Sequence, residues 1–241
     1  MCDRIEPWHH GTVVRATEMP TYWDYNAVRV EDGDPGLSAE ELIEAADVLQ
    51  EGLAHRRLEL EDAGAGARLR ADFESAGWAS ERLAWMRRAG PPPRPSPSVE
   101  EVPYAATREL RDAWHRGSEW WADDPAAEHF LELEESVAAR RASRAFTIQE
   151  AGEPVAFVTL WAPPDAGAAE VEQAFTLPER RGAGLGGALV TSALAAARRE
   201  IGWIVADDEG RPKRLYERLG FRTVWVQYAF IRYPESRHSP A

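Results

Sequence analysis

Cysteine and histidine are too scarce in this sequence to build a disulfide or a metal site. The single cysteine, Cys2, excludes a disulfide or a thiolate-bound metal ion within one chain. The six histidines show no spacing typical of metal ligands, and His9 and His10 are expected to form a solvated pair near the N-terminus. We therefore expect a protein without a bound metal.

Long apolar runs are also missing. No stretch of about 18 apolar residues occurs, and the first ten residues lack the apolar core of a signal peptide. We therefore expect a cytoplasmic protein with no membrane partner. Lys213 is the only lysine beside abundant arginine and alanine, a composition typical of a GC-rich bacterial genome.

Lysine and arginine are fewer than aspartate and glutamate, 28 against 41, and the formal net charge is −13. This balance argues against nucleic acid or an anionic membrane as a partner, because proteins that neutralise phosphates are usually basic. An acidic surface attracts cationic ligands such as amines, or it serves solubility alone. The 241 residues are 44% hydrophobic and include ten tryptophans, which excludes a disordered chain and suggests one or two domains.

A proline-rich segment, GPPPRPSPS, marks the clearest boundary in the chain. Its prolines fix the backbone and remove hydrogen-bond donors, so an extended, semi-rigid linker is predicted. The boundaries expected are an N-terminal domain at 1–89, the linker at 90–98, a C-terminal domain at 99–235 and a disordered tail at 236–241.

Hydrophobic periodicity and turn residues predict the elements of each domain. The N-terminal domain has the order β-α-β-α-β, and a capping box from Ser38 to Glu41 starts its first helix. Its strands are predicted at 25–31, 55–61 and 82–88, and its helices at 37–53 and 66–78. The C-terminal domain is predicted to have helices at 103–117, 126–141, about 185–200 and 211–220, strands at 144–150, 154–161, 169–176 and 203–208, and a final strand pair within 222–233.

Four glycines stand within 182–187, between a predicted strand and a predicted helix. The G-x-G-x-x-G spacing from Gly182 to Gly187, with Asp207 about 20 residues further on, fits the fingerprint of an NAD-dependent oxidoreductase. However, residues 178–181 stand between the strand and the first glycine, and too few residues follow Asp207 to complete a doubly wound sheet. A turn that serves only helix–strand packing is a further alternative, but it gives no reason for the two arginines before it.

The same stretch also reads R-x-x-G-x-G from Arg181 to Gly186. It follows the strand sequence EVEQAFT, and about 30 residues later RLYERLGF predicts a short helix closed by a Gly-Phe turn. In this order the motifs resemble the GNAT superfamily of acetyl-CoA-dependent N-acetyltransferases, over roughly residues 99–233. The resemblance implies an α/β (α+β) GNAT fold, with a mixed central sheet flanked by helices, and acetyl-CoA as the co-substrate. Glycines at a helix N-terminus suit the pyrophosphate of coenzyme A, because unpaired N–H groups gather there.

By this resemblance, the pantetheine arm lies along the predicted strand, and the acetyl carbonyl meets the N–H group of Thr176. Where the family often has an asparagine that touches the cofactor, this sequence has Glu209, and we do not assign that contact. The residues implied to bind the cofactor are Phe175, Thr176, Leu177, Arg181, Gly182, Ala183, Gly184, Leu185 and Gly186.

The resemblance also implies the catalytic groups. Glu170 lies where the family often places its general base, and Glu172 on the same strand face is a second candidate. Tyr216 lies where the family's general-acid tyrosine lies, and it would protonate the departing thiolate. The residues alone leave the alternatives open: solvated carboxylates on a sheet surface and a tyrosine buried in the core.

The acceptor site is expected in the loop between the first two helices of the C-terminal domain. Trp120, Trp121 and Asp123 lie in this loop, and aromatic faces with carboxylates suit a cation. Tryptophans in the core and aspartates that cap the next helix are the alternative. The function expected is transfer of the acetyl group of acetyl-CoA to a primary amine of a small cationic acceptor, by direct attack in a ternary complex. An acyl-CoA-binding sensor or pseudoenzyme without transfer is the alternative, and a homodimer is left open.

A weak internal repeat relates the two domains. Residues 69–88 parallel residues 214–233, with Phe73 opposite Tyr216. The N-terminal domain therefore resembles a degenerate half of a GNAT domain, whose segment 32–38 is short and acidic and lacks the R-x-x-G-x-G pattern. We expect this domain not to bind acetyl-CoA. An unrelated α/β appendage is the alternative.

Overall fold

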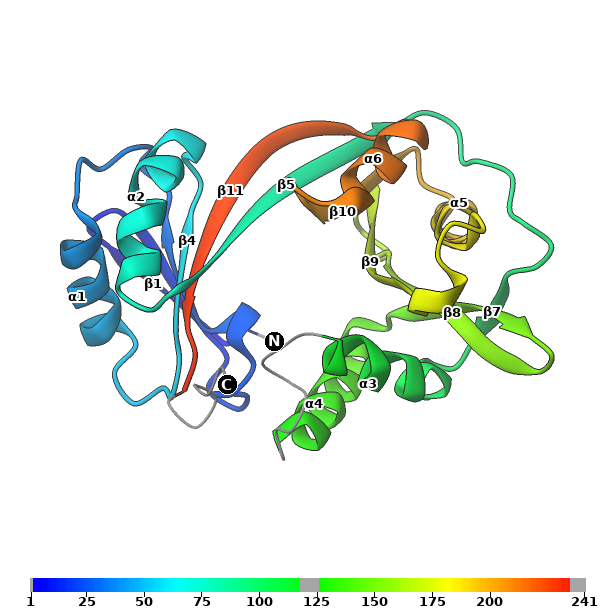
Figure 1. Cartoon of the computed structure of the whole chain (residues 1–241), viewed down its shortest axis with the longest axis horizontal. Helices are drawn as coiled ribbons and strands as arrows, with labels where there is room; N and C mark the ends of the chain where they lie inside the picture. The colour runs from blue at the N-terminus through cyan, green and yellow to red at the C-terminus, as the bar shows by residue number, and fades with distance from the viewer. Residues whose placement is uncertain (1, 118–125, 235–241) are drawn as a thin grey trace. The chain divides into compact units, whose positions relative to one another are not determined.

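The computed structural model describes residues 2–117 and 126–234 (Figure 1). These residues form two compact units, and two long strands, β5 (Ala79–Ala89) and β11 (Arg222–Arg232), contribute residues to both. The first unit comprises residues 2–84, 207–209 and 225–234, and the second comprises residues 85–117, 126–206 and 210–224.

The first unit is a mixed sheet with two helices. β3 (Ala27–Val30) and β4 (Arg56–Leu60) are parallel, and β4 pairs with β11 in the antiparallel sense. The helices are α1 (Ala39–Leu49) and α2 (Ala63–Ser75). The β-α-β-α-β order expected from the sequence is present, and the predicted capping box is confirmed: the N–H of Glu41 donates to Ser38 Oγ at 3.2 Å, and the N–H of Ser38 donates to Glu41 Oε2 at 2.8 Å.

An antiparallel hairpin precedes this order, and the sequence did not predict it. It consists of β1 (Arg4–Trp8) and β2 (Gly11–Arg15), and β2 continues the sheet beside β3. Its first strand is mostly exposed, so alternating hydrophobicity does not mark it. His9 and His10 form the turn of this hairpin.

The end of α2 repeats the end of α6 (Arg211–Arg218) hydrogen bond for hydrogen bond. The N–H of Trp78 donates to the carbonyl of Phe73 at 3.0 Å, and the N–H of Phe221 donates to the carbonyl of Tyr216 at 3.0 Å. The glycine after each helix has a left-handed φ, +80° and +91°, that a side chain would strain. The backbone therefore supports the register of the internal repeat.

The second unit has the strand order β5-β10-β9-β8-β7-β6. β9 (Ala168–Thr176) and β10 (Ile201–Asp207) are parallel, whereas β6 (Glu100–Val102), β7 (Arg144–Glu150), β8 (Glu153–Trp161) and β9 form an antiparallel ladder. The sheet is thus mixed, as expected, and it is not the doubly wound parallel sheet of a dinucleotide-binding dehydrogenase.

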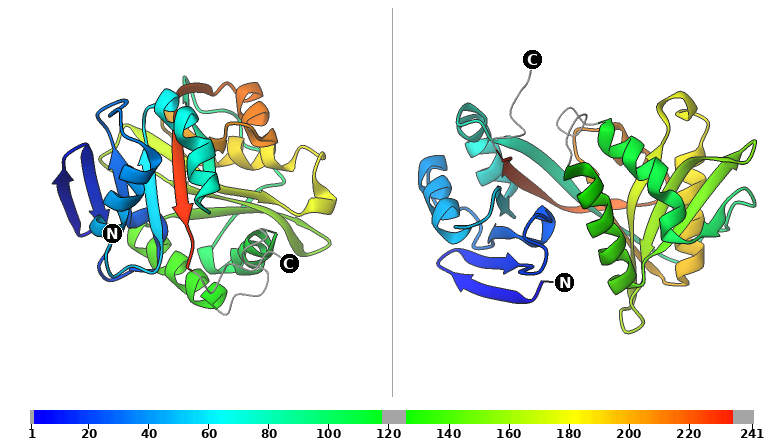
Figure 2. Two further views of the ribbon diagram at one scale, coloured as in Figure 1. Left: turned by 60° about the vertical axis from the view of Figure 1, so that its left-hand side comes forward. Right: turned by 90° about the horizontal axis from the view of Figure 1, so that it is seen from below.

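Helices cover both faces of β8 and β9. α3 (Arg108–Arg116) and α4 (Ala126–Arg141) lie on one face, and α5 (Leu185–Ala197) lies on the other (Figures 1 and 2). On the α3 face, the Trp114 and Phe157 rings meet with their centroids 6.3 Å apart. β9 therefore runs between the two helical layers, and its C-terminal end leads toward the start of α5.

Three elements of the second unit differ from the sequence prediction. The helix expected at 103–117 is a 3-10 turn, η2 (Tyr104–Thr107), followed by α3. The strand pair expected within 222–233 is wrong: β11 is one continuous strand, because its residues include no glycine or proline that could turn the chain. The short strand β6 follows the proline-rich segment and was not predicted.

Candidate active site

The C-terminal half of β9 contains a β-bulge. In the ladder with β8, Phe157 pairs with Phe175 and Thr159 pairs with Glu172, so two β9 residues lie opposite one β8 residue. The first of these two, Gln173, has a φ of +48°, in the left-handed region that side chains disfavour. The bulge redirects β9 just before its last residues.

The edge of β9 beyond the bulge is not paired with β10. Within the described residues, the register between the two strands ends at Ile204 and Val171, whereas β9 continues to Thr176. The N–H of Leu177 donates to the carbonyl of Val155 on β8 at 3.0 Å. Because hydrogen-bonded and non-hydrogen-bonded pairs alternate along an antiparallel ladder, the N–H of Thr176 points away from β8 and toward this open edge. An extended ligand with amide groups can pair there.

The glycine stretch forms an exposed loop that ends at the N-terminus of α5. Gly182 and Gly184 have φ values of +92° and +83°, and among the described residues no atom lies within 4 Å of where a Cβ would stand on either. The first hydrogen bond of the helix runs from the N–H of Ala188 to the carbonyl of Gly184, at 3.1 Å. The N–H groups of residues 185–187 precede it and have no partner within the helix. Such a helix end carries partial positive charge and suits a phosphate group.

Arg181 ties the loop to the end of β9. Its Nε donates to the carbonyl of Thr176 at 3.2 Å, and its guanidinium lies 6.0 Å from the centroid of the Phe175 ring. The exposed guanidinium adds a full positive charge beside the helix N-terminus. The neighbouring Arg180, in the 3-10 turn η3 (Pro178–Arg180), pairs instead with Glu150 at 3.1 Å. The two arginines therefore differ, and Arg181 is the one attached to the open strand edge.

Tyr216 is buried on α6, with 5% of its surface exposed. Burial raises the pKa of its hydroxyl to about 12, so the group keeps its proton at neutral pH. The preceding residue, Leu215, faces the start of α5: a Cβ on Gly186 would lie 3.3 Å from Leu215 Cδ2. This contact places α6 against the glycine-rich end of α5.

Glu170 and Glu172 lie on the same face of β9 and share one arginine. Arg141 Nη2 lies 2.7 Å from Glu172 Oε1 and 3.9 Å from Glu170 Oε2, and the Arg141 guanidinium stacks over the Trp161 ring at 4.0 Å. Burial raises the pKa of Glu170 to about 7, repulsion from Glu172 adds to the increase, and Arg141 opposes it. Glu170 therefore titrates near neutral pH, as a general base requires. The Arg141 contacts could not be predicted from the sequence, because no local pattern pairs the end of α4 with β9.

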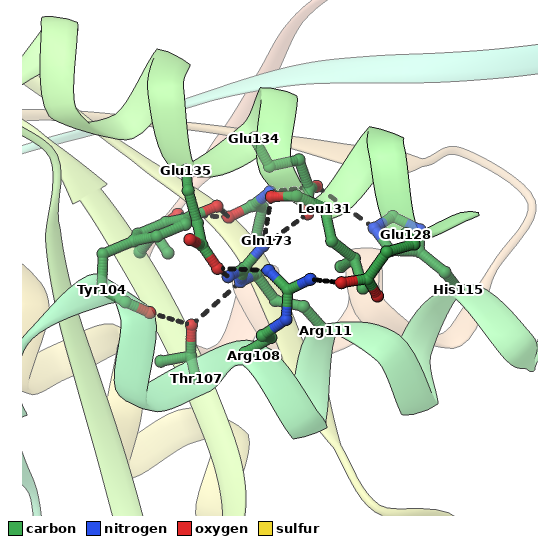
Figure 3. A network of polar contacts seen from close by, with 11 residues as sticks. Tyr104, Thr107, Arg108, Arg111, His115, Glu128, Leu131, Glu134, Glu135 and Gln173 are labelled. Atoms are coloured by element: carbon green, nitrogen blue, oxygen red, sulfur yellow. Dashed lines mark hydrogen bonds and ion pairs between the residues drawn. The ribbon is translucent and has the colours of Figure 1, made fainter. Parts of the chain in front are cut away.

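A buried polar network joins η2, α3 and α4 to the bulge of β9 (Figure 3). Its centre is Arg111, fully buried, which donates to Glu134 Oε2 at 2.9 Å and to Glu135 Oε1 at 2.8 Å. Gln173 Nε2 donates to the other oxygen of Glu134 at 2.8 Å, and Tyr104 donates its hydroxyl hydrogen to Gln173 Oε1 at 2.9 Å. The sequence analysis missed this network. The arginine at 111 and the adjacent carboxylates at 134 and 135 were the available signal, but their partners are set by tertiary packing.

The remaining sequence-based assignments concern the acceptor loop and Glu209. Trp120, Trp121 and Asp123 lie outside the described residues. Glu209, which was left out of the cofactor contacts, pairs with Arg70 at 3.0 Å.

Across residues 2–117 and 126–234, no cluster of histidine, cysteine or acidic side chains could hold a metal ion. In that same part of the chain, no helix has the length and apolar character to cross a membrane.

Comparison with known proteins assigns the second unit to a family. The profile described as the Acetyltransferase (GNAT) family matches residues 105–221, which contain β9, the glycine loop and Tyr216. No curated protein matches the sequence.

Solved structures share the fold over nearly the whole chain, at low sequence identity. A conserved protein of unknown function from Staphylococcus epidermidis has a TM-score of 0.73 and 13% identity, and the alignment covers 97% of this chain and 94% of that one. A GCN5-related N-acetyltransferase from Kribbella flavida has a TM-score of 0.56, 19% identity and coverages of 94% and 88%. A tandem GNAT protein from the clavulanic acid biosynthesis pathway has a TM-score of 0.53, 13% identity and coverages of 95% and 83%. The chain therefore carries an acetyltransferase domain of the GNAT family and is an acyltransferase.

Proposed function

We propose that this protein transfers the acetyl group of acetyl-CoA to a primary amine of a small cationic acceptor, by direct attack in a ternary complex. The observation that carries the proposal is the open edge of β9, which begins after Val171 and leads directly into the glycine loop at the start of α5. A linear molecule with a diphosphate at one end and amide groups along its length fits this arrangement. Coenzyme A has that construction.

The residues present fit the two ends of the coenzyme. The N–H groups at 182–187 and the guanidinium of Arg181 are positioned to bind the diphosphate. The backbone of residues 172–176 offers unpaired groups to the amides of the pantetheine arm. Phe175, Leu177, Ala183 and Leu185 complete the proposed contact surface. When bound, acetyl-CoA supplies an activated acetyl thioester.

Three groups of the chain carry the proposed chemistry. The Glu170 carboxylate, directly or through water, accepts a proton from the acceptor ammonium and so produces the neutral amine that can attack. The N–H of Thr176 donates to the acetyl oxygen as negative charge develops on it. The Tyr216 hydroxyl donates a hydrogen bond to the sulfur as the carbon–sulfur bond breaks, and the departing thiolate takes up the second proton of the attacking nitrogen, so that the amide and coenzyme A are released. The Tyr216 pKa of about 12 lies above the ordinary thiol value of about 8.5, so stabilisation by this hydrogen bond is favoured over complete proton transfer from the tyrosine.

The acceptor class follows from negative charge on the α3–α4 face of β9. Glu170 and Glu172 face this side, where Arg141 Nη2 lies 3.9 Å from the first and 2.7 Å from the second. A cationic amine is attracted to this charge, and the repulsion that raises the pKa of Glu170 falls when a cation approaches. We propose that Trp120, Trp121 and Asp123 complete the acceptor site.

The first unit offers no equivalent site for the coenzyme. β3 and β4 stay paired to their ends, and the N–H of Glu61 continues the pairing with the carbonyl of Val30 at 3.1 Å. The segment 32–38, which connects β3 to α1, is acidic, and Asp34 within it pairs with Arg68 at 2.7 Å. Within residues 2–84, β3 and β4 stay paired, and the segment between β3 and α1 contains Gly33 and Gly36 but lacks the R-x-x-G-x-G pattern. We therefore propose that this unit is a degenerate GNAT half that binds no acetyl-CoA.

Thermal unfolding with added ligands tests the proposed function. A ligand present at 100 times its dissociation constant stabilises the folded state by about 2.7 kcal/mol, which corresponds to a Tm increase of about 5–10 °C for a protein of this size. We expect such an increase with acetyl-CoA and none with NAD. An absence of any shift with acetyl-CoA and with free CoA would contradict the proposal. A shift without thiol release across a panel of amines would identify an acyl-CoA-binding sensor instead.

Replacement of Tyr216 by phenylalanine tests the role of its hydroxyl. Loss of a hydrogen bond to a charged group costs about 1.5–3 kcal/mol, so we expect kcat to fall about 10- to 100-fold, with little change in the Kd for acetyl-CoA. Thiol release under saturating substrates measures the effect. Tyr228→Phe is the matched control, because Tyr228 is equally buried but lies in the first unit. Full activity of Tyr216→Phe with every accepted amine would refute the assignment.

A further inference from the structure

The bulge of β9 is built on a residue that does not favour its own backbone conformation. Gln173 has a φ of +48°, although only glycine and, less readily, asparagine adopt this region without strain. A strained residue persists only where its surroundings hold it in place. The contacts of the Gln173 side chain are therefore expected to hold this conformation in place.

Three polar groups hold the Gln173 side chain at both ends of its amide. Tyr104 and Thr159 donate their hydroxyl hydrogens to Oε1, at 2.9 and 3.3 Å, and Nε2 donates to Glu134 Oε1 at 2.8 Å. Tyr104 on η2 and Glu134 on α4 reach the amide as Figure 3 shows, and Thr159 contacts it from β8, so three elements hold it. A glutamine held in this way can adopt only one position.

The partners of Gln173 are themselves immobilised. Glu134 is 3% exposed, and its second oxygen accepts from Arg111, which is fully buried. The Arg111 guanidinium also lies 4.4 Å from the centre of the Tyr104 ring, and its Nε donates to Thr107 Oγ1 at 3.1 Å. Separation of this buried ion pair would leave a charge unpaired inside the protein, which is strongly destabilising. The network is thus a rigid anchor for the bulge.

We infer that Gln173 is a positioning residue: its anchored amide holds the left-handed bulge and thereby sets the open edge of β9 that receives the pantetheine arm. The inference rests on the proposed function. The bulge lies between the last residue paired with β10 and Thr176, so a change at Gln173 alters the strand edge. The N–H groups of the glycine loop are oriented by the start of α5, and Arg181 links the loop to β9 only beyond the bulge, at the Thr176 carbonyl. Damage to the bulge should therefore affect the arm of the coenzyme and spare its diphosphate.

Two substitutions at Gln173 separate positioning from mere stability. Gln173→Ala and Gln173→Gly lose the same side-chain contacts, but only glycine tolerates a φ of +48° without strain. Binding is measured by calorimetry with two probes. Acetyl-CoA carries both the pantetheine arm and the diphosphate. Adenosine 3′-phosphate 5′-diphosphate carries the nucleotide and the diphosphate without the arm.

We expect Gln173→Ala to weaken acetyl-CoA binding at least tenfold and Gln173→Gly by threefold or less, while both leave the affinity for the diphosphate probe within twofold. Gln149→Ala is the control, because Gln149 is an exposed glutamine at the register shift between β7 and β8, and it should change neither affinity. Equal losses in the alanine and glycine variants, parallel losses with both probes, or no loss at all would overturn the inference.

Tyr104→Phe provides a second route if the alanine variant fails to fold. It removes one hydrogen bond to Gln173 Oε1 and keeps the ring beside Arg111. We expect a three- to fivefold loss of acetyl-CoA affinity and no loss with the diphosphate probe, and an unchanged acetyl-CoA affinity would overturn the inference. Failure of the proposed function looks different, because the unmodified protein would then bind neither probe.

Discussion

Replacement of Gly184 by valine is expected to weaken acetyl-CoA binding by about a hundredfold or more and to leave the protein folded. Gly184 precedes α5 with a φ of +83°, a conformation that a β-branched residue strongly disfavours. No atom of residues 2–117 and 126–234 lies within 4 Å of where its Cβ would stand, so the valine meets no clash within this part of the chain. It projects instead into the space that we propose for the diphosphate, and it disturbs the N–H groups that would bind that group. Two effects on binding therefore combine, and a hundredfold loss corresponds to about 2.8 kcal/mol.

Gly152→Val is the matched control for this experiment. Gly152 lies in the exposed turn between β7 and β8, with a φ of +91° and no atom within 4 Å of where its Cβ would stand. Both variants should lose a similar few degrees of Tm, and calorimetric titration should show that only Gly184→Val loses acetyl-CoA affinity. If both variants bind acetyl-CoA equally well, the glycine loop does not hold the coenzyme.

Replacement of Glu170 by glutamine is expected to lower kcat by about 10²- to 10⁴-fold, the usual contribution of a general base. The pKa of about 7 sets the direction of the pH dependence. Below this value Glu170 is protonated and cannot accept a proton, so kcat/KM of the unmodified enzyme should rise with pH and level off above about 7. In Glu170→Gln this rise should disappear. Rates from pH 5.5 to 8.5 with an acceptor of high amine pKa measure both effects.

The variant Glu172→Gln tests the cause of the raised pKa of Glu170. Repulsion from Glu172 helps to raise the pKa of Glu170, so its removal should shift the midpoint of the pH profile below 7. Arg141 loses its closer carboxylate in this variant and can move toward Glu170, which acts in the same direction. A midpoint that stays at 7 in Glu172→Gln, or a Glu170→Gln enzyme with more than half of the original rate, would contradict the assignment of the base.

Local sequence signals predicted most elements of the fold. α4, β7 and the cluster from β9 to α6 lie where periodicity, caps and glycines placed them, because each is encoded within its own segment. The first hairpin escaped prediction because β1 is mostly exposed and does not alternate. The contribution of β11 to the first unit also could not be predicted, since long-range strand pairing leaves no local mark.

In the candidate site, too, residues marked by local motifs could be predicted, and residues set by long-range contacts could not. The glycine loop, Glu170 and Tyr216 could be proposed from the sequence, because short motifs in order carry the resemblance that implies them. Gln173 was not found: a left-handed φ at a glutamine contradicts local preference, and only contacts from η2, β8 and α4 account for it. The shared arginine at 141 was missed for the same reason, because it reaches β9 across the sheet.

The central claim is that the loop at 181–187 and the open edge of β9 together bind coenzyme A. A crystal structure of the protein with CoA tests it most directly. The account predicts the diphosphate against the backbone N–H groups of that loop and the pantetheine amides paired with β9 beyond Val171. Coenzyme bound elsewhere, with this loop and edge empty, would contradict it.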